Sequence, residues 1–355
     1  MEFTHLHVHT EYSLLDGSNK IKEYVARVKE LGMDSAAITD HGVMYGVIDF
    51  YRAAREAGIN PILGCEVYVA PGSRFDREVG SGDDRYYHLV LLAENNQGYS
   101  NLMKIVSKAF VEGFYYKPRV DLELLEKYHE GIIALSACLA GEVARYLARG
   151  MYEDAKIAAL RYQDIFGKGN FFLELQDHGI PEQQTVNQQL LRMHRETGID
   201  LVATNDVHYT MAEDAEPHDV LLCLQTQKKL SDENRMRYEG GQYYVKSPEE
   251  MARLFPYALE ALENTHRIAE RCHVEIEFGV TKLPKYDVPD GFTSWEYLNK
   301  LCHEGLEQRY HPVTEELKKR LDYELSTIKN MGYVDYFLIV WDFIKYARDN
   351  DIMVG

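Results

Sequence analysis

The feature that most constrains this chain is a run of alternating histidines near its start, His5-Leu6-His7-Val8-His9. Because side chains two residues apart share a face of a β-strand, the run predicts a strand over residues 3–8 with its imidazoles on one side. Such a row is unsuited to an apolar core. Neutral imidazole is, however, a common ligand for zinc and related metals. The run therefore predicts the start of a metal site that other parts of the chain complete.

The composition narrows the class of protein. The 355 residues suffice for one large domain and part of another. No apolar run reaches the roughly 18–20 residues of a membrane span, and the first residues lack the pattern of a signal peptide. The five cysteines are scattered and odd in number, which argues against a disulfide framework. We therefore expect a cytoplasmic protein without a membrane partner.

The net charge of −18 excludes a protein that grips duplex DNA with its whole surface. Any contact with nucleic acid would have to be local.

The hydrophobic pattern predicts a chain of alternating strands and helices. Seven short apolar strands are expected at residues 3–8, 35–39, 61–69, 87–93, 131–136, 171–175 and 199–204. The expected helices cover residues 18–31, 47–58, 99–111, 141–148, 153–166, 182–197, 212–226, 248–255 and 257–271. This order is typical of a parallel sheet built from βα units. Periodicity leaves two topologies open, a barrel and a doubly wound open sheet.

The character of the chain changes after about residue 280. Residues 282–293 contain proline and aspartate and are expected to be a linker. Helices are expected at 295–309, 315–331 and 336–350, and residues 352–355 resemble the beginning of a strand. We therefore expect one domain over residues 1–280, and a linker with the start of a second domain over 281–355. We also expect that the chain was cut from a longer protein.

Ligand-type side chains recur where the expected strands end. In a βα barrel functional groups lie at the carboxyl ends of the strands. Collecting them gives five histidines, three carboxylates and one thiol: His7, His9, His41, His88, His208, Asp16, Glu66, Asp206 and Cys138. This mixture suits Zn²⁺, Mn²⁺ or Fe²⁺ better than Mg²⁺ or Ca²⁺. Nine ligands exceed what one ion accepts, so a cluster of two or three ions is predicted, which is suited to phosphoester hydrolysis.

Several members have simpler readings when taken singly. Asp40, beside His41, could be a helix cap. Cys138 could be ordinary core packing. His88 lies near the beginning of its apolar run, so the strand-end rule fits it poorly. His5 would lie deeper than His7 and is expected to be a core or supporting residue. Glu66 is different, because a carboxylate within an apolar strand is costly without a cation.

The motifs in order resemble a known family. The stretches His7–Gly17, Ile38–Gly42, Gly64–Val69, Ser136–Glu142 and Ala203–Tyr209, together with His88, are similar to the PHP (polymerase and histidinol phosphatase) domain. Ser13–Gly17, Tyr115–Arg119 and Gly332–Asp342 resemble the version found in bacterial replicative DNA polymerase III alpha subunits. The resemblance implies an α/β fold, a distorted (β/α)7 barrel (PHP, TIM-like), followed by the helical start of a polymerase palm region.

The resemblance also implies how the ligands are shared. One ion would be held by His7, His9, Glu66 and Asp206, a second by Glu66, His88 and Cys138, and a third by Asp16, His41 and His208. Asp16 and Cys138 stand where stand-alone PHP phosphatases usually have histidine, which argues against a small-molecule phosphatase. The catalytic aspartates of the polymerase would lie beyond Gly355.

Three functions follow as expectations. The first is a metal-dependent 3′–5′ exonuclease that proofreads for the polymerase, with Asp16, Glu66, Asp206 and His208 as catalytic residues. The second is a structural metal site that stabilises a platform for the palm and other replisome subunits. The third is a small-molecule phosphatase.

The exonuclease hypothesis includes contacts to the DNA 3′ end. Lys117 and Arg119 are expected to contact the backbone. Tyr12 is expected to bind substrate, and Tyr12, Tyr45 and Tyr209 could stack on unpaired bases.

Overall fold

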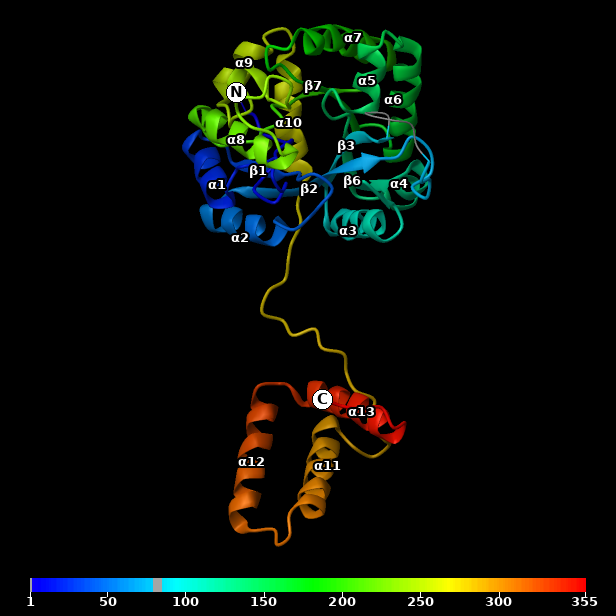
Figure 1. Ribbon diagram of the computed structural model, residues 1–355, viewed down its shortest axis with the longest axis vertical. Coiled ribbons are helices and arrows are strands. Elements are labelled where there is room, and N and C mark those ends of the chain that lie inside the picture. The colour runs from blue at the N-terminus through cyan, green and yellow to red at the C-terminus, as the bar shows by residue number, and fades with distance from the viewer. Residues whose placement is uncertain (1, 79–84) are drawn as a thin grey trace. The chain divides into compact units, whose positions relative to one another are not determined.

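The computed structural model describes residues 2–78 and 85–355. Its contacts divide the chain into two compact units, Met1–Glu275 and Ile276–Gly355. Figure 1 shows the strands in the first unit and only helices in the second. The glycine, aspartate and arginine residues between positions 71 and 85 predict a loop there. This loop is described up to residue 78 and again at residue 85, and its middle lies outside the described residues.

The first unit is built on a curled sheet. Its strands are β1 (Ser35–Ile38), β2 (Asn60–Val69), β3 (Tyr87–Ala93), β6 (Ile132–Leu135), β7 (Phe171–Leu175) and β8 (Leu201–Ala203). Neighbours pair in the order β1-β2-β3-β6-β7-β8. The distorted barrel predicted from the sequence is confirmed.

Residues 3–9 complete the ring between β1 and the end of β8. On one side, the amide of Thr39 donates to the carbonyl of Val8 at 2.9 Å, and on the other the amide of His9 donates to the carbonyl of Val207 at 2.8 Å. The segment is extended but forms isolated bridges rather than the regular strand that its pattern predicts, with a bend at His7. The chain start is therefore part of the barrel wall.

Strand β3 departs from the expected parallel arrangement. It pairs antiparallel with both β2 and β6, whereas β1–β2, β6–β7 and β7–β8 are parallel. The beginning of β3 therefore lies at the same rim as the carboxyl ends of its neighbours. This direction explains why His88, near the beginning of its strand, lies opposite Tyr68 near the end of β2.

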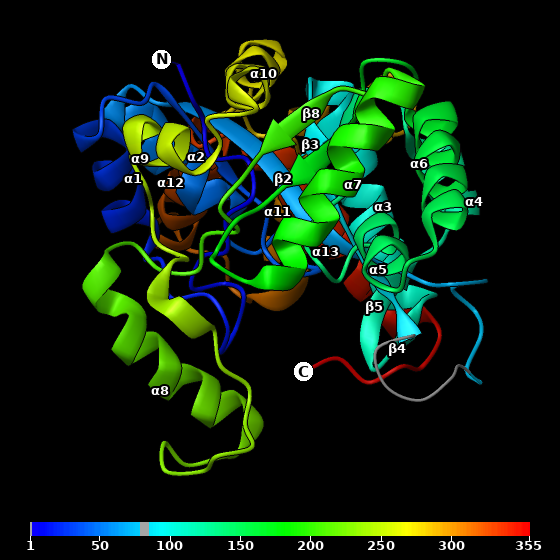
Figure 2. The same cartoon turned by 90° about the horizontal axis from the view of Figure 1, so that it is seen from above.

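The helices surround the sheet. Their bounds are α1 (Ile21–Glu30), α2 (Val47–Ala57), α3 (Asn96–Val111), α5 (Glu142–Ala148), α6 (Tyr152–Phe166), α7 (Pro181–Thr197), α8 (Ala215–Thr226), α9 (Pro248–Leu254) and α10 (Leu259–Arg271). Figures 1 and 2 show α1 and α2 at one side of the barrel and α3, α5 and α6 at the opposite side. Local signals set several ends: α7 begins with Pro181 and stops at the left-handed Gly198, and Ser247 and Glu250 form a capping box on α9.

The aromatic stretch over residues 113–119, between two expected elements, predicts irregular structure but is in fact structured. Residues 113–119 contain a short hairpin of β4 (Phe114–Tyr115) and β5 (Lys117–Val120), and β5 pairs with β2. The turn residue Tyr116 has a positive φ of 61°. A further helix, α4 (Leu122–Tyr128), follows and is capped by the Asp121 side chain.

The apolar core lies inside the barrel towards the amino ends of the parallel strands. It joins Leu6, Ala37, Ile62, Val90, Leu92, Ile133, Leu135, Ala137, Phe172 and Val202 with three residues of α10, Ile268, Ala269 and Cys272. All are buried. Helix α10 therefore contributes to the core at this end of the barrel.

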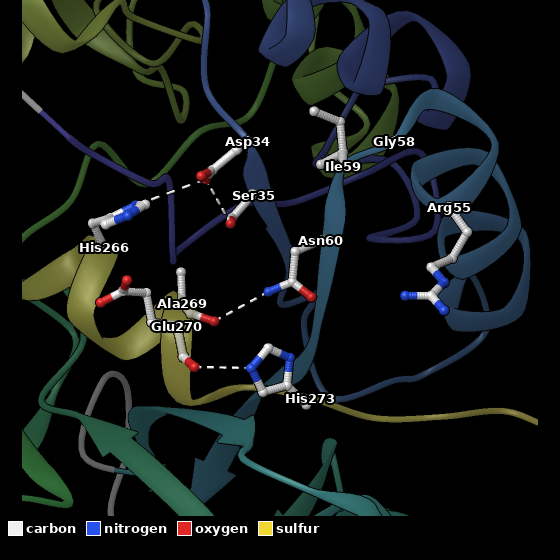
Figure 3. A pocket seen from close by; sticks show the side chains of 10 residues that line it. All are labelled: Asp34, Ser35, Arg55, Gly58, Ile59, Asn60, His266, Ala269, Glu270 and His273. Carbon is white, nitrogen blue, oxygen red and sulfur yellow. Dashed lines mark hydrogen bonds and ion pairs between the residues drawn. The ribbon is translucent and has the colours of Figure 1, made fainter.

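A polar pocket of about 460 Å³ lies beside α10 at the beginning of β1 and β2 (Figure 3). Several of its polar groups are bonded to one another: Asn60 donates to the carbonyl of Ala269 at 3.1 Å, and a His273 ring nitrogen lies 2.9 Å from the carbonyl of Glu270. None of the predicted metal ligands lines this pocket. We interpret this pocket as a gap in the packing between α10 and the sheet and not as a functional site.

The second unit is a small helical assembly of α11 (Ser294–Arg309), α12 (Glu315–Asn330) and α13 (Val334–Asp349). Leu298, Leu325 and Leu338, one from each helix, form its buried core. Several aromatic residues of α13 are exposed, and the largest exposed fraction among them is the 67% of Phe343. Residues 352–355 form no strand, contrary to expectation.

Across the described ranges, 2–78 and 85–355, no helix has both the length and the apolar character that crossing a membrane requires.

Candidate metal centre

The nine predicted ligands gather at one end of the barrel. They lie on the chain start (His7, His9), the loop before α1 (Asp16), the segment after β1 (His41), β2 (Glu66), β3 (His88), the turn after β6 (Cys138) and the segment after β8 (Asp206, His208). This end is the one formed by the carboxyl ends of the parallel strands and the amino end of β3.

Glu66 is the hub of the cluster. One of its oxygens lies 3.1 Å from His7 Nε2 and 2.9 Å from His88 Nδ1, and its other oxygen contacts His41 Nδ1. The side chain is fully buried. A buried carboxylate surrounded by three imidazoles is suited to bridge two metal ions, because each imidazole nitrogen can bind a cation together with it.

Asp206 joins the two histidines of the chain start. Its Oδ1 lies 3.0 Å from His9 Nε2 and 3.2 Å from His7 Nε2. Cys138 lies beside His88, with its sulfur 3.7 Å from His88 Nδ1.

Asp16 and His41 form the outer part of the cluster. Asp16 Oδ2 lies 2.9 Å from His41 Nε2, and Asp16 Oδ1 lies 4.0 Å from His208 Nε2. The His9 and His41 rings stack with centroids 3.8 Å apart.

Ligand atoms fall into three overlapping groups, each with atoms within 4.8 Å of one another: His7, His9 and Glu66; His41, Glu66 and His88; and His9, His41 and His208. Their imidazole and carboxylate atoms suit a zinc-like ion, and their overlap suits more than one. The residues therefore fit the metal class that the sequence predicts.

The backbone is strained where ligands are presented. Six non-glycine residues in the described chain have a positive φ, and three of them, Leu15, Ala137 and Asp206, lie at or directly before Asp16, Cys138 and Asp206. Such conformations cost free energy and concentrate at functional sites. The local turns are therefore fitted to the ligands.

The electrostatics of the cluster favour a bound cation. Burial alone would raise the pKa of Glu66, but His88 and His41 outweigh it and hold this pKa well below its ordinary value. Burial would lower the pKa of His41, but Glu66 and Asp16 raise it to about 10. Burial and the neighbouring His41 and His208 lower the pKa of His9 to about 3. The carboxylates are thus held ionised and His9 resists protonation, so both are in the form that binds a metal, whereas His41 would have to release a proton to bind one.

A supporting layer was not predicted from the sequence. Glu174 Oε1 lies 2.7 Å from His7 Nδ1, so it orients the imidazole whose Nε2 faces Glu66. Gln176 and Thr204 donate to the same carboxylate. The signal was available, because Glu174 interrupts an apolar strand as Glu66 does. Asp40 accepts from the amide of Thr10 at 2.6 Å and thereby fixes the backbone next to His9. It does not cap a helix.

Two aromatic residues reach the outer ligands from outside the barrel. The Tyr238 hydroxyl lies 3.2 Å from both Asp16 Oδ1 and His208 Nε2. His218 Nε2 lies 2.7 Å from the Asp16 carbonyl. Because His218 follows no expected strand, the sequence predicts a surface or packing residue at this position, and no sequence pattern marks Tyr238.

His5 does not join the cluster. Its Nε2 lies 2.8 Å from the carbonyl of Lys246, and its ring packs against Phe3. The bend at His7 separates it from the face that carries His7 and His9.

The predicted substrate contacts fare differently. Arg119 is fully buried, and its guanidinium donates to the carbonyls of Gly113 and Arg74, so the expectation that it contacts DNA is corrected. Tyr209 is also buried. Lys117 Nζ lies 5.3 Å from the centre of the Tyr68 ring, which packs beside His88.

Tyr12 and Tyr45 differ in their contacts and exposure. The Tyr12 hydroxyl donates to Asp49 at 2.9 Å, whereas Tyr45 is 59% exposed.

Comparison with known families accounts for this arrangement. Residues 5–178 match the PHP domain model, and residues 296–355 match the model of the bacterial DNA polymerase III alpha NTPase domain. The barrel and its histidine-rich rim are therefore those of a PHP domain.

Curated relatives match along the whole chain. The DNA polymerase III subunit alpha of Treponema pallidum is 49% identical over 356 residues, which cover 100% of this chain and 30% of the relative. That of Borreliella burgdorferi is 49% identical and covers 99% of this chain and 31% of the relative. The chain thus carries the PHP domain of the bacterial DNA polymerase III alpha family, and it spans about a third of these relatives' length.

A solved amidohydrolase from Chromobacterium violaceum covers 59% of this chain, and 88% of that structure is covered, with 15% identity and a TM-score of 0.41. This weak likeness adds nothing to the fold seen in the sheet itself.

Proposed function

We propose that the chain is the N-terminal part of a replicative DNA polymerase III alpha subunit, and that its PHP domain is a metal-dependent 3′–5′ exonuclease that proofreads in cis. The observation that carries the proposal is the gathering of all nine competent ligand side chains in one cluster around Glu66. Residues 1–280 would form the phosphoesterase domain. Residues 281–355 would form a linker and the first part of the polymerase region, whose active site would lie outside this chain.

The side chains divide the work of holding three ions of Zn²⁺, Mn²⁺ or Fe²⁺. We assign His7, His9, Glu66 and Asp206 to the first, Glu66, His88 and Cys138 to the second, and Asp16, His41 and His208 to the third. When bound, such ions would activate water and neutralise the phosphodiester.

The chain's own contribution is orientation. Glu174 fixes the tautomer of His7, and the Asp206 carbonyl, 2.7 Å from His208 Nδ1, leaves Nε2 of that ring with its lone pair. Lys117 is the residue that we assign to the DNA backbone. The remaining partners would be the DNA 3′ end, the rest of the alpha chain and other replisome subunits.

The test is hydrolysis of a 3′-labelled single strand by the whole chain, after chelation and reloading with Mn²⁺ or Zn²⁺. We expect metal-dependent release of 3′ nucleotides by the parent and none by Asp206→Asn. Asp200→Asn is the matched control, because Asp200 precedes β8 at the opposite end of that strand. No release by a parent that retains its metal would contradict the nuclease.

The second candidate is a structural metal site that supports the polymerase. The complete burial of His7, His9 and Glu66 favours it, because a closed cluster stabilises without reacting. It predicts a lower melting temperature on chelation without hydrolysis of any ester. A small-molecule phosphatase, the third candidate, would cleave a monoester in preference to the DNA strand.

A further inference from the structure

Tyr238 lies over the outer ligands although it comes from outside the barrel strands. It belongs to the segment between α8 and α9, and its hydroxyl oxygen lies 3.2 Å from Asp16 Oδ1 and 3.2 Å from His208 Nε2. Those two atoms come from positions far apart in the chain. The hydroxyl therefore stands where the side chains assigned to the third ion converge.

The hydrogen-bonding capacity of this hydroxyl is only loosely used. A phenol has one hydrogen, which here has two neighbours. Both distances exceed the roughly 2.5–2.7 Å of a firm hydroxyl–carboxylate bond. A carbonyl can only accept, so His208 Nδ1, beside the Asp206 carbonyl, carries the proton and Nε2 carries a lone pair. Asp16 and His208 are both assigned to the third ion, and once that ion takes the lone pairs that face Tyr238, the hydrogen of the hydroxyl is available to another acceptor.

The position of the hydroxyl is set by packing. The Tyr238 ring stacks on His218, with centroids 5.1 Å apart and planes 11° apart, and it lies 4.7 Å from the Tyr243 ring. His218 is itself held by the Asp16 carbonyl. A bidentate ion pair between Arg235 and Asp219 connects the segment that carries Tyr238 to α8. A donor held this way costs little reorganisation when its acceptor arrives.

We infer that Tyr238 is a phosphate-recognition residue of this site, whose hydroxyl donates to a non-bridging oxygen of the phosphodiester beside Asp16 and His208. The inference rests on the proposed function and deepens it. The chemistry fits because a phenol is neutral at pH 7 and can donate, whereas the carboxylates around it would repel a phosphate.

The test measures phosphate binding separately from hydrolysis. The whole chain, its Tyr238→Phe variant and a Tyr243→Phe control are loaded with Mn²⁺, and the affinity for inorganic phosphate is measured by calorimetry. Tyr243→Phe removes a hydroxyl from the same aromatic cluster. Because a hydrogen bond to a charged group is lost, we expect roughly tenfold weaker phosphate binding in Tyr238→Phe and none of this loss in the control.

Three outcomes would overturn the inference. They are unchanged phosphate affinity in Tyr238→Phe, a parent that does not bind phosphate, and loss of metal from Tyr238→Phe by elemental analysis, which would make this residue part of the metal-holding set. The phosphate-binding result can be separated from the test of the exonuclease. A parent that binds phosphate through Tyr238 but releases no nucleotide would support this inference and contradict the proofreading activity.

Discussion

The same strands build two chemically opposite ends of the barrel interior. Strand β2 presents Ile62 to the apolar core and Glu66 to the ligand cluster, and β7 presents Phe172 and then Glu174. At the apolar end, α10 packs into the core, and stability comes from burial. At the rim, the buried groups are titratable and need cations. The difference shows that each strand stabilises the fold with the residues at one end and carries the ligand side chains at the other end.

The largest expected effect comes from removing the charge at the hub of the rim. Glu66→Gln takes the shared carboxylate from His7, His41 and His88. Loss of a supporting residue costs about 10–100-fold in metal affinity, so loss of this ligand should cost more than about 100-fold. Metal content after dialysis against limiting Zn²⁺ measures it. A full complement of metal in the variant would show that Glu66 is not a ligand.

A change at the apolar end should lower stability without changing metal binding. Ile133→Ala leaves a cavity in the core and should lower the free energy of unfolding by about 2–5 kcal/mol while the metal content stays that of the parent. Urea denaturation and elemental analysis give the two readings. Metal loss at full stability would erase the distinction between the ends.

A smaller effect is expected one layer behind the ligands. Glu174→Gln keeps the size of the side chain but removes the charge that fixes His7, so metal affinity should fall by about 10–100-fold. Competition with a chromophoric chelator gives the affinity. Glu196→Gln, which loses an exposed ion pair with Lys156, is the control, and an equal loss there would refute a specific role for Glu174.

A further effect concerns the pH dependence of stability and comes from a buried cation near the rim. Burial lowers the pKa of Lys246 from 10.5 to about 8, although Glu250 and Asp177 oppose the change. Between those values the unfolded chain holds a proton that the folded chain has released, so this residue makes stability rise with pH from about 8 to 10.5. Lys246→Met should remove that rise. Chemical denaturation of both proteins across this range tests it, and parallel profiles would contradict it.

Sequence alone predicted much of this molecule because its signals are local. Periodic apolar residues predicted most helices to within a few residues, and Glu66 was recognised as a carboxylate in an apolar strand. Strand direction is not a local property, so the reversed β3 was missed and His88 fitted its rule poorly. Burial of a long polar side chain is not local either, which is why Arg119 was misassigned.

Two site residues show where pattern reasoning ends. Glu174 obeys the rule that identified Glu66, so applying it to every strand would have found this residue. Tyr238 reaches Asp16 only through the path of the segment after α8, and nothing in its neighbours' spacing encodes that path.

The reversed direction of β3 has a consequence for variation among related chains. Because β2 runs towards the rim and β3 runs away from it, the connection from Val69 to Tyr87 begins and ends at the rim. Lengthening that connection would reshape the approach to the ligands and leave every pairing of the barrel in register. An insertion after Ala93 would fall at the apolar end instead. The fold thus provides one place where access to the site can evolve independently of the barrel.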